Sequence, residues 1–332
     1  MRGKGDGPGL EGVLVVNKPP GPTSHDVVAL VRRLSGTRRV GHGGTLDPFA
    51  SGVLPLFLGR ATRLVEYHAA DRKQYRATIC LGSRSTTDDL DGELTPVEGP
   101  AVSRSDVEAA LRELTGTIEQ RPPDHSAIRV GGRRAYQLAR AGEIPPLVPR
   151  QVTIDRLDLV AWDDRDPGRP VAVVEVDCSP GTYVRAIARD LGDRLGVGAY
   201  LCALVRTASG PFRLDDAVSL DELRSEAGTG PGALARRLKP IDAGLEALPQ
   251  LELTADEVAD VTLGRFVRPA APMPPGSSDV PVRLVAGDGR LVGIGLRRGA
   301  RFVPTKVLAG PTKVLAGSTD VLAGTSGTRD EA

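Results

Sequence analysis

The chain has 332 residues, of which 40% are hydrophobic and 3% aromatic, and its formal net charge at pH 7 is +1. This length leaves room for two domains, because single hydrophobic cores usually stop growing at about 250 to 300 residues. The composition is typical of a soluble, folded protein, no run approaches the ~18 consecutive apolar residues of a membrane span, and the small charge gives no overall signal for nucleic acid.

The cysteines and acidic residues give no pattern of a metal site. Cys80, Cys178 and Cys202 lack metal-ligand spacing, and we predict that all three are reduced core residues of a cytosolic protein. Residues 87–98 nearly match the calcium loop of an EF-hand, but the first position is Thr and Pro96 breaks the helix that should follow. We therefore predict an acidic turn over residues 88–92 instead. Because the first residues lack the apolar segment of a signal peptide, we expect the cytoplasm as location.

The N-terminal elements begin after a glycine-rich stretch. Residues 1–10 predict a flexible tail, and residues 12–17 predict a short buried strand that ends at a turn over residues 18–21. Residues 23–26 form a capping box, which predicts the start of an amphipathic helix. The apolar residues on one face of this helix are Val27, Leu30, Val31 and Leu34.

The loop over residues 39–55 holds one carboxylate, Asp47, among glycine, proline and apolar residues. Glycine frees the backbone and Pro48 fixes φ, so we expect a rigid bend that presents the carboxylate. An acid in this setting is either a catalytic group or a residue that accepts backbone N–H groups in an Asx-turn. The sequence of the loop alone does not decide between these two interpretations of Asp47.

Two segments alternate between apolar and polar residues and predict half-buried strands. In residues 75–81 the apolar face includes Tyr75, and residues 171–178 show the same pattern. The second strand leads through a Ser-Pro-Gly turn into a predicted helix with Thr182 as its N-cap. Arg185 falls in the first turn of this helix, close to a strand end, where functional side chains are frequent.

Helices and strands do not alternate regularly, which favours the α+β class. Another amphipathic helix is predicted to start at Ser105, with Glu108 closing its capping box. Residues 121–150 are rich in Pro, Gly and Arg and include a short helical run near residues 135–141. They are either a surface excursion or a mobile insertion that grips a partner.

A change in composition near residues 240–249 marks a domain boundary. Residues 251–263 predict a helix or a strand followed by a helix, and residues 282–296 predict a β-hairpin. We expect a small β-rich module over residues 246–304. Residues 305–332 repeat a Val-Leu-Ala-Gly motif with a period too short for a solenoid, which predicts a disordered low-complexity tail, although the first copy also fits a terminal strand.

Several motifs, in this order along the chain, resemble those of the TruB family, the tRNA pseudouridine-55 synthases. The resemblance implies a pseudouridine synthase fold of the α+β class, with a mixed, mostly antiparallel sheet flanked by helices and a small C-terminal β-rich PUA-like domain. The motifs that carry it are residues 12–19, 39–63, 75–78, 86–92, 121–129 and 178–185.

The resemblance also implies an organisation and an activity. Residues 11–245 would form the catalytic domain, residues 121–150 an RNA-gripping insertion, and residues 246–304 the PUA-like domain. Such an enzyme isomerises uridine 55 in the loop of the tRNA T-arm by base flipping, with an Asp as nucleophile or base. We expect tRNA as partner, a monomer, no membrane contact, no cofactor and no metal.

The family's site residues carry over to named positions here. Asp47 would start the reaction as an ionised group, since the pKa of an Asp is about 4, and Arg185 would hold it charged. Tyr75 would lie against the flipped base, and stacking suits it better than proton transfer because a phenol has a pKa of about 10. His42 would fill the gap left by the flipped base. Further substrate-binding residues implied are Tyr183, Leu204, Lys18, Arg60 and Arg206.

The sequence departs from the family pattern at three positions, His125, Pro180 and Val205, where Tyr, a basic residue and Arg are common. These changes bear on RNA affinity more than on chemistry. Two other functions compete with the family's: a tRNA-binding or folding protein without catalysis, and another Asp-dependent, glycosidase-like enzyme. A glycosidase needs a second carboxylate as its acid.

Overall fold

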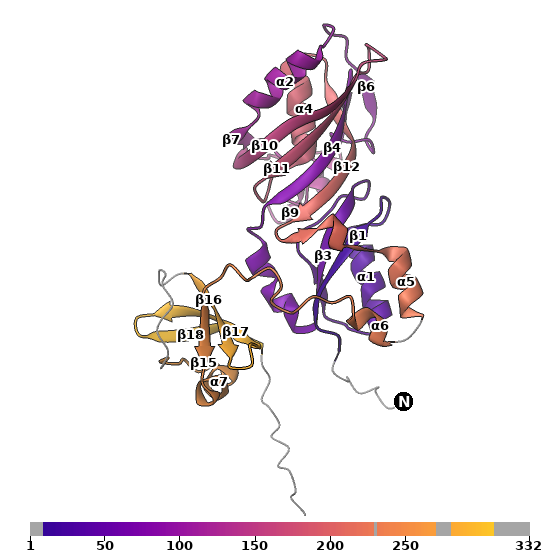
Figure 1. Ribbon diagram of the computed structural model, residues 1–332. Helices are drawn as coiled ribbons and strands as arrows, with labels where there is room; N and C mark the ends of the chain where they lie inside the picture. The colour runs from indigo at the N-terminus through magenta and orange to yellow at the C-terminus, as the bar shows by residue number, and fades with distance from the viewer. Residues whose placement is uncertain (1–8, 229–230, 270–279, 309–332) are drawn as a thin grey trace, which may run out of the picture. The chain divides into compact units, whose positions relative to one another are not determined.

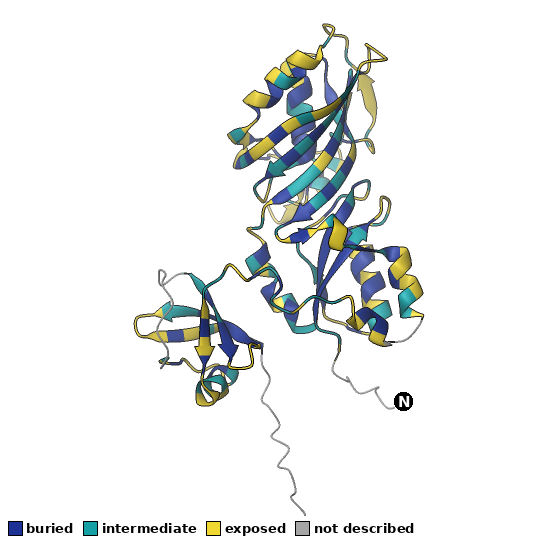
Figure 2. Ribbon diagram, in the orientation of Figure 1, coloured by how far each residue is buried: buried dark blue, intermediate teal, exposed yellow. Residues whose placement is uncertain are grey.

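The computed structural model describes residues 9–228, 231–269 and 280–308, and the chain divides between Ala247 and Leu248 into two compact units. Both units combine strands with helices, so the predicted α+β class is confirmed (Figure 1). Each unit also has apolar residues of its own at its centre (Figure 2). The two units are therefore described separately.

A mixed, mostly antiparallel sheet forms the centre of the first unit, as predicted. In the described part of the chain its strands follow the order β14-β1-β3-β12-β4-β11-β10-β7, with β2 beside β3 and β13 beside β12. Within that order β1 pairs with β14, and β3 with β12, in parallel; the other pairs are antiparallel. The strands are β1 (Gly12–Lys18), β2 (Val40–His42), β3 (Ser51–Leu58), β4 (Lys73–Leu81), β7 (Gly116–Gln120), β10 (Arg150–Asp163), β11 (Val171–Cys178), β12 (Ala199–Ser209), β13 (Phe212–Arg213) and β14 (Val218–Ser219).

Helices cover one face of this sheet, while around β1 and β3 the other face is apolar as well. α4 packs on β12, α2 packs on β10 and on α4, and α1 packs against α5 (Figure 1). α1 also packs against β2. Each fully buried Val, Leu or Ile in such a contact stabilises the fold by about 1.5 to 3 kcal/mol relative to leaving it exposed. The helices of this unit are α1 (Ser24–Ser35), η1 (Gly59–His68), α2 (Arg104–Glu113), α3 (Ala135–Arg140), α4 (Val184–Leu195), η2 (Leu214–Asp216), α5 (Leu220–Ala227) and α6 (Pro231–Ala235).

The predicted strand faces are confirmed. In β4 the apolar set Ala77, Ile79 and Leu81 is buried, and in β11 every second residue from Ala172 to Cys178 is buried. All of β11 pairs with residues 73–80 of β4. A side-chain period of two therefore places the apolar residues of both strands on one face.

Two helix starts differ from prediction. The capping box of α2 consists of Ser103 and Asp106, two residues earlier than expected, and Glu108 instead pairs with Arg104. α4 begins after Tyr183, whose side chain makes no cap hydrogen bond, so Thr182 is not its N-cap. The α1 box is as predicted, with Thr23 and Asp26 bonded to each other's backbone N–H groups.

Residues 121–150 carry little regular structure, beyond the short pair β8 (Arg129–Val130) and β9 (Arg133–Arg134) and the helix α3. Exposed Ile144 lies in the irregular part of this segment. A second small pair, β5 (Ser83–Ser85) and β6 (Leu94–Pro96), flanks the acidic turn predicted over residues 88–92. Asp88 in that turn has a φ of 61°, a left-handed conformation that Asp tolerates better than most residues.

The second unit is a small β-rich body. Its sheet has the order β15-β16-β17-β18, and α7 (Ala255–Thr262) packs on it. The predicted strand and helix over residues 251–263 and the hairpin over 282–296 are confirmed. The first repeat copy contributes residues 305–307 to β18, which pairs with β17, so the terminal-strand alternative is confirmed there and the tail does not begin at residue 305. The tail from residue 309 lies outside the described residues, as do residues 1–8. The strands are β15 (Gln250–Leu253), β16 (Pro281–Ala286), β17 (Leu291–Arg298) and β18 (Arg301–Val307).

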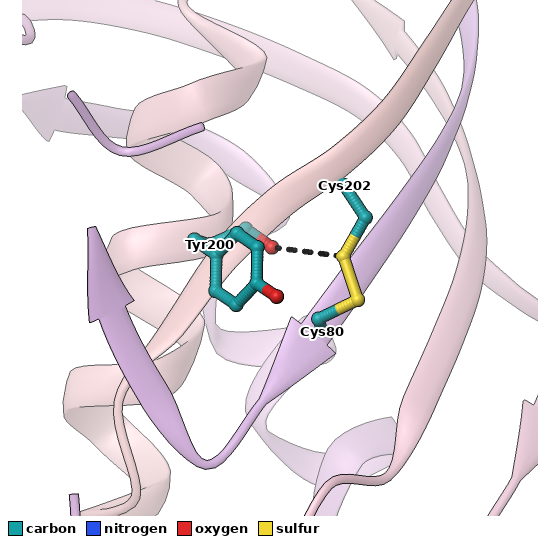
Figure 3. The surroundings of a disulfide bond; sticks show 3 residues. All are labelled: Cys80, Tyr200 and Cys202. Atoms are coloured by element: carbon teal, nitrogen blue, oxygen red, sulfur yellow. Dashed lines mark hydrogen bonds between the residues drawn. A yellow bond between two sulfur atoms is a disulfide. The ribbon is translucent and has the colours of Figure 1, made fainter. Parts of the chain in front are cut away.

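Cys80 and Cys202 form a disulfide between β4 and β12, so the prediction of three reduced cysteines is wrong for these two (Figure 3). The strands are neighbours, and a register shift between Leu201 and Ala203 places Cys202 beside Cys80 with a Cα–Cα distance of 6.0 Å. A pair 122 residues apart in sequence cannot be recognised from spacing. Cys178 is free and buried, as predicted.

Candidate active site

The Asp47 loop joins β2 to β3 and is held by side chains from three other elements. Ser24 in α1 bonds both backbone groups of Leu46: the Leu46 N–H donates to the hydroxyl at 2.9 Å, and the hydroxyl donates to the Leu46 carbonyl at 3.0 Å. Lys18 donates to the Pro48 carbonyl at 3.0 Å. The residues on both sides of Asp47 are thus fixed, which gives the rigid bend that the sequence predicts.

Arg206 fixes the other end of the loop. Its Nε donates to the Val53 carbonyl at 2.7 Å, and one terminal nitrogen donates to the Gly44 carbonyl at 3.1 Å. β3 and β12 approach each other so closely here that a Cβ on Gly52 would lie 2.2 Å from the Arg206 carbonyl oxygen. Only glycine fits at that position, where φ is also 103°.

Arg185 meets the carboxylate of Asp47. The Arg185 Nε lies 3.0 Å from Asp47 Oδ2, and a terminal nitrogen of the same guanidinium lies 3.2 Å from Asp89 Oδ2. Arg185 also donates to the main-chain oxygens of Thr87 and His125, each at 3.0 Å. The side chain of Arg185 is 6% exposed, so this cation is buried between two carboxylates and two carbonyls.

The charge of Asp47 reflects opposing effects. Burial raises the pKa of this carboxyl above its ordinary value, and the negative charge of Asp89 raises it further, while Arg185 and Lys18 lower it. Its side chain is still 35% exposed, so the group can reach a ligand. A desolvated carboxylate with a cation beside it is an activated nucleophile or base.

These residues line a cavity of about 460 Å³, within the range of about 300 to 1,000 Å³ that is usual for small-ligand sites. Asp47 is the only carboxylate among the described lining residues. Seven of the predicted site residues line this cavity: Asp47, Arg185, Tyr75, His42, Tyr183, Leu204 and Arg206.

Tyr75 enters the cavity from β4, where it pairs in register with Arg206 of β12. Burial raises the pKa of the Tyr75 phenol above its ordinary value, and the Arg206 guanidinium only partly offsets this. The phenol is therefore protonated near neutral pH. It offers a planar apolar face and a hydroxyl donor rather than a base.

His42 and Tyr183 lie at other parts of the cavity wall. His42 ends β2, its Nδ1 accepts the Gly44 N–H at 3.3 Å, and its ring meets that of His25 edge to face. Burial lowers the pKa of the His42 imidazole, and the neighbouring His25 lowers it further. Tyr183 immediately precedes α4. Leu204 is buried in β12 opposite Ala77.

Two predicted substrate-binding residues lie outside the cavity lining. Lys18 is fully buried and donates to the carbonyls of Pro19, Pro22 and Pro48, so it supports the loop instead of facing a ligand. Arg60 forms an ion pair with Glu11 at 2.6 Å.

Several residues of the site are not indicated by single sequence features. Asp89 is buried and pairs with Arg185, although the sequence shows only an acidic turn. Gln120 ends β7, and its side-chain amide bonds both backbone groups of Tyr183: its Oε1 accepts from the N–H at 2.8 Å and its Nε2 donates to the carbonyl at 3.1 Å. The family-like motif over residues 86–92 is the sequence signal that includes Asp89, and no motif quoted above includes Gln120.

The described ranges contain no group of His, Cys, Asp or Glu side chains that could hold a metal ion. In the same ranges, no helix combines the length and apolar character that crossing a membrane requires.

Two family models match most of the first unit. The description "TruB family pseudouridylate synthase (N terminal domain)" matches residues 32–184, and "tRNA pseudouridylate synthase B C-terminal domain" matches residues 185–246. The first range contains Asp47 and Tyr75, and Arg185 is the first residue of the second. Both matches end before the second unit.

Curated relatives and solved structures match over most of the chain. The tRNA pseudouridine synthase B of Thermobifida fusca is 46% identical over 305 residues, which cover 90% of this chain and 99% of the relative. That of Rhodococcus jostii is 48% identical and covers 78% of this chain and 83% of the relative. A chain in the crystal structure of a Cbf5-Nop10-Gar1 complex is 27% identical with a TM-score of 0.70, over 91% of this chain and 86% of that one.

Proposed function

The chain belongs to the TruB family of pseudouridylate synthases, and we propose that it is a cytoplasmic tRNA pseudouridine synthase that isomerises uridine 55 in the T-arm. The observation that carries this proposal is the pair formed by Asp47 and Arg185 in the wall of a cavity. One carboxylate, kept charged in a partly desolvated setting, matches a reaction that starts at a ribose and needs no second acid.

The reaction balances without an oxidant, a reductant or a cofactor. The bond between N1 of uracil and C1′ breaks, the detached base rotates and a bond forms between C5 and C1′. The C5 proton leaves to solvent, and N1 takes up a proton from solvent. Asp47 starts this sequence, either by attack on C1′ or by removal of a sugar proton. Both routes require the ionised carboxylate, and the Arg185 guanidinium favours that form.

The other wall residues suit a flipped uridine. A base taken out of its stack costs a few kcal/mol and is held in enzymes by stacking on aromatic or apolar side chains. We assign that contact to Tyr75 and Leu204, since both line the cavity. His42 lies at the cavity wall beside two glycines, where it can occupy the space that the base leaves.

We also propose the roles of the outer parts of the chain. Residues 121–150 grip the T-arm, since exposed Ile144 and Arg133 offer apolar and cationic contacts on the same segment as the cavity residue His125. The β-rich second unit acts as a PUA-like RNA-binding domain. The enzyme works as a monomer, because one chain supplies the whole cavity wall described above.

A glycosidase-like function fits the site less well. Such enzymes use two carboxyl groups that flank the scissile bond, about 5 to 9.5 Å apart. Asp47 is the only acid among the described cavity-lining residues, and Asp89 is engaged with Arg185 behind it.

The test follows the C5 proton. The protein is incubated with an unmodified tRNA transcript that carries tritium at C5 of its uridines, and tritium release is compared with the appearance of pseudouridine at position 55. We expect both to rise together, and both to disappear with Asp47→Asn, which keeps shape and removes the charge.

A matched control is Asp158→Asn, because the Asp158 side chain is 60% exposed and lies in β10, outside the cavity lining. This variant should release tritium at the parent rate. Release that persists in Asp47→Asn would overturn the assignment of Asp47, and modification at another uridine would overturn the assignment of position 55.

A further inference from the structure

Lys73 is a cavity residue that the proposed chemistry does not use. It is the first residue of β4, two positions before Tyr75, and it pairs in register with Cys178 of β11. It lines the same cavity as Asp47 and Arg185 and is 9% exposed. A lysine this deeply buried requires a partner, because burial of an ammonium is costly unless its charge and N–H groups are satisfied.

The protein supplies Lys73 with few acceptors. In the described part of the chain, its Nζ makes one hydrogen bond, to the main-chain oxygen of Asp71. The Asp71 carboxylate attracts it but is itself bonded to His68 Nδ1 at 3.0 Å. An ammonium has three N–H groups, so two of them have no protein acceptor.

The other basic groups of the cavity are already engaged. Arg185 is held by Asp47, Asp89 and two carbonyls. Arg206 is held by the carbonyls of the loop that it supports. Among the described lysines and arginines of the cavity wall, Lys73 is the one whose N–H groups mostly lack a protein acceptor.

The charge balance of the wall favours an anion beside Lys73. Among the described residues, Lys73, Arg185 and Arg206 line the cavity with one carboxylate, Asp47. Asp89 pairs with Arg185 and Asp71 attracts Lys73, but neither acid lines the cavity. Burial lowers the pKa of Lys73, the Asp71 carboxylate partly offsets this, and the nearby Arg206 lowers the pKa further. A bound anion would reverse this effect by stabilising the charged ammonium.

We propose that Lys73 forms an anion subsite that binds a phosphodiester group of the RNA backbone next to the nucleotide held against Tyr75. A nucleotide that enters the cavity brings its flanking phosphates with it, and an ammonium with free N–H groups is the complementary donor. The inference rests on the proposed function, since it takes RNA as the ligand.

The first test measures RNA affinity against salt for the full-length protein. Lys73→Met keeps the length of the side chain and removes the charge, while Lys73→Arg keeps the charge. Loss of one phosphate contact should make the slope of log K against log salt less steep by about 0.7 to 0.9 and weaken T-arm binding about tenfold at low salt. Lys73→Arg should retain most of the parent slope.

Lys239→Met is the matched control, because Lys239 pairs with Asp216 at 3.2 Å and does not line the cavity. It should leave both slope and affinity unchanged. Thermal melting of each variant shows whether it is folded.

A second test changes the RNA. Its first measurement is the binding of modified RNA to the parent protein, which requires no protein variant. T-arm stem-loops are made with one uncharged methylphosphonate linkage on either side of the target uridine. One of the two should bind the parent protein about tenfold more weakly, and Lys73→Met should show no such loss for that linkage. Equal losses in parent and variant at both linkages, or an unchanged salt slope in Lys73→Met, would overturn the subsite. If the parent itself neither binds nor modifies the stem-loop, the proposed function fails instead.

Discussion

At the scale of single residues, the protonation of Asp47 sets the working pH range. Its pKa lies above the ordinary value of 3.8 because burial and Asp89 outweigh Arg185 and Lys18. Since the ionised form reacts, we expect kcat/KM for pseudouridine formation to fall as pH drops through this raised pKa, so the acidic limb lies above 3.8. The measurement is a pH profile of tritium release.

Asp88 provides the control for that profile. Burial also raises the pKa of the Asp88 carboxyl, to about 6, but this residue pairs with Arg189 and does not line the cavity. Asp88→Asn should leave the acidic limb where it is. A limb that disappears in Asp88→Asn would assign the titration to Asp88 and contradict the role given to Asp47.

Lys18 gives a prediction about stability. Burial lowers its pKa from 10.5 to about 8 in the folded protein, so the unfolded chain binds more protons between these values. Stability that depends on this group must then rise as pH increases from about 8 toward 10.5. Relative to Lys18→Met, the parent should gain up to about 3 kcal/mol of unfolding free energy across this window.

Chemical denaturation at several pH values measures this difference. Near neutral pH Lys18→Met should also be less stable than the parent, because it leaves the carbonyls of Pro19, Pro22 and Pro48 without their donor. A constant difference between the two proteins from pH 8 to 10 would contradict the lowered pKa.

At the scale of elements, Gln120 joins the end of β7 to the start of α4 through both backbone groups of Tyr183. Arg185 lies two residues further on, and α4 has no side-chain cap of its own. Gln120→Ala should therefore misplace Arg185, lowering kcat about tenfold or more with little change in KM, and shift the acidic limb upward as Arg185 moves from Asp47.

Val152→Ala is the control for a general loss of stability. Val152 is buried in β10 opposite Ile118 of β7, on the same edge of the sheet, and does not line the cavity. It should melt at a lower temperature yet keep the parent kcat and pH profile. If Gln120→Ala changes only the melting temperature, its role is structural.

The elements also show what the sequence could and could not predict. Alternation in residues 75–81 and 171–178 predicts the strand faces, since a period of two fixes which residues of a strand point to the same face. The start of α2 was missed because Ser103 with Asp106 and Ser105 with Glu108 both satisfy the capping pattern, and only packing chooses between them. Motif order predicts which residues meet in the cavity, whereas the Gln120 and Lys18 contacts join residues to main-chain atoms and leave no side-chain pattern.

At the scale of the whole molecule, the two units have separate cores. The buried cluster of the second unit draws on residues from Leu251 to Phe302, and the clusters of the first unit end at Ala243. We therefore expect residues 1–247 to fold alone. Because the truncated chain keeps the entire cavity wall, it should retain kcat at saturating tRNA.

The truncation should nevertheless raise KM if the second unit binds RNA. The β17 and β18 hairpin exposes Arg298 and Arg301, and Arg301 lies 4.3 Å above the ring of half-exposed Phe266, an arrangement of cation and aromatic face that suits a nucleic acid. In the full-length chain, Arg298→Gln combined with Arg301→Gln should reproduce part of the KM increase and make the salt slope of tRNA binding less steep. Steady-state kinetics at several salt concentrations distinguish the outcomes. A truncated protein with the parent KM and the parent kcat would show that the second unit takes no part in binding. A truncated protein with the parent KM but a reduced kcat would show that the second unit supports the catalytic unit instead.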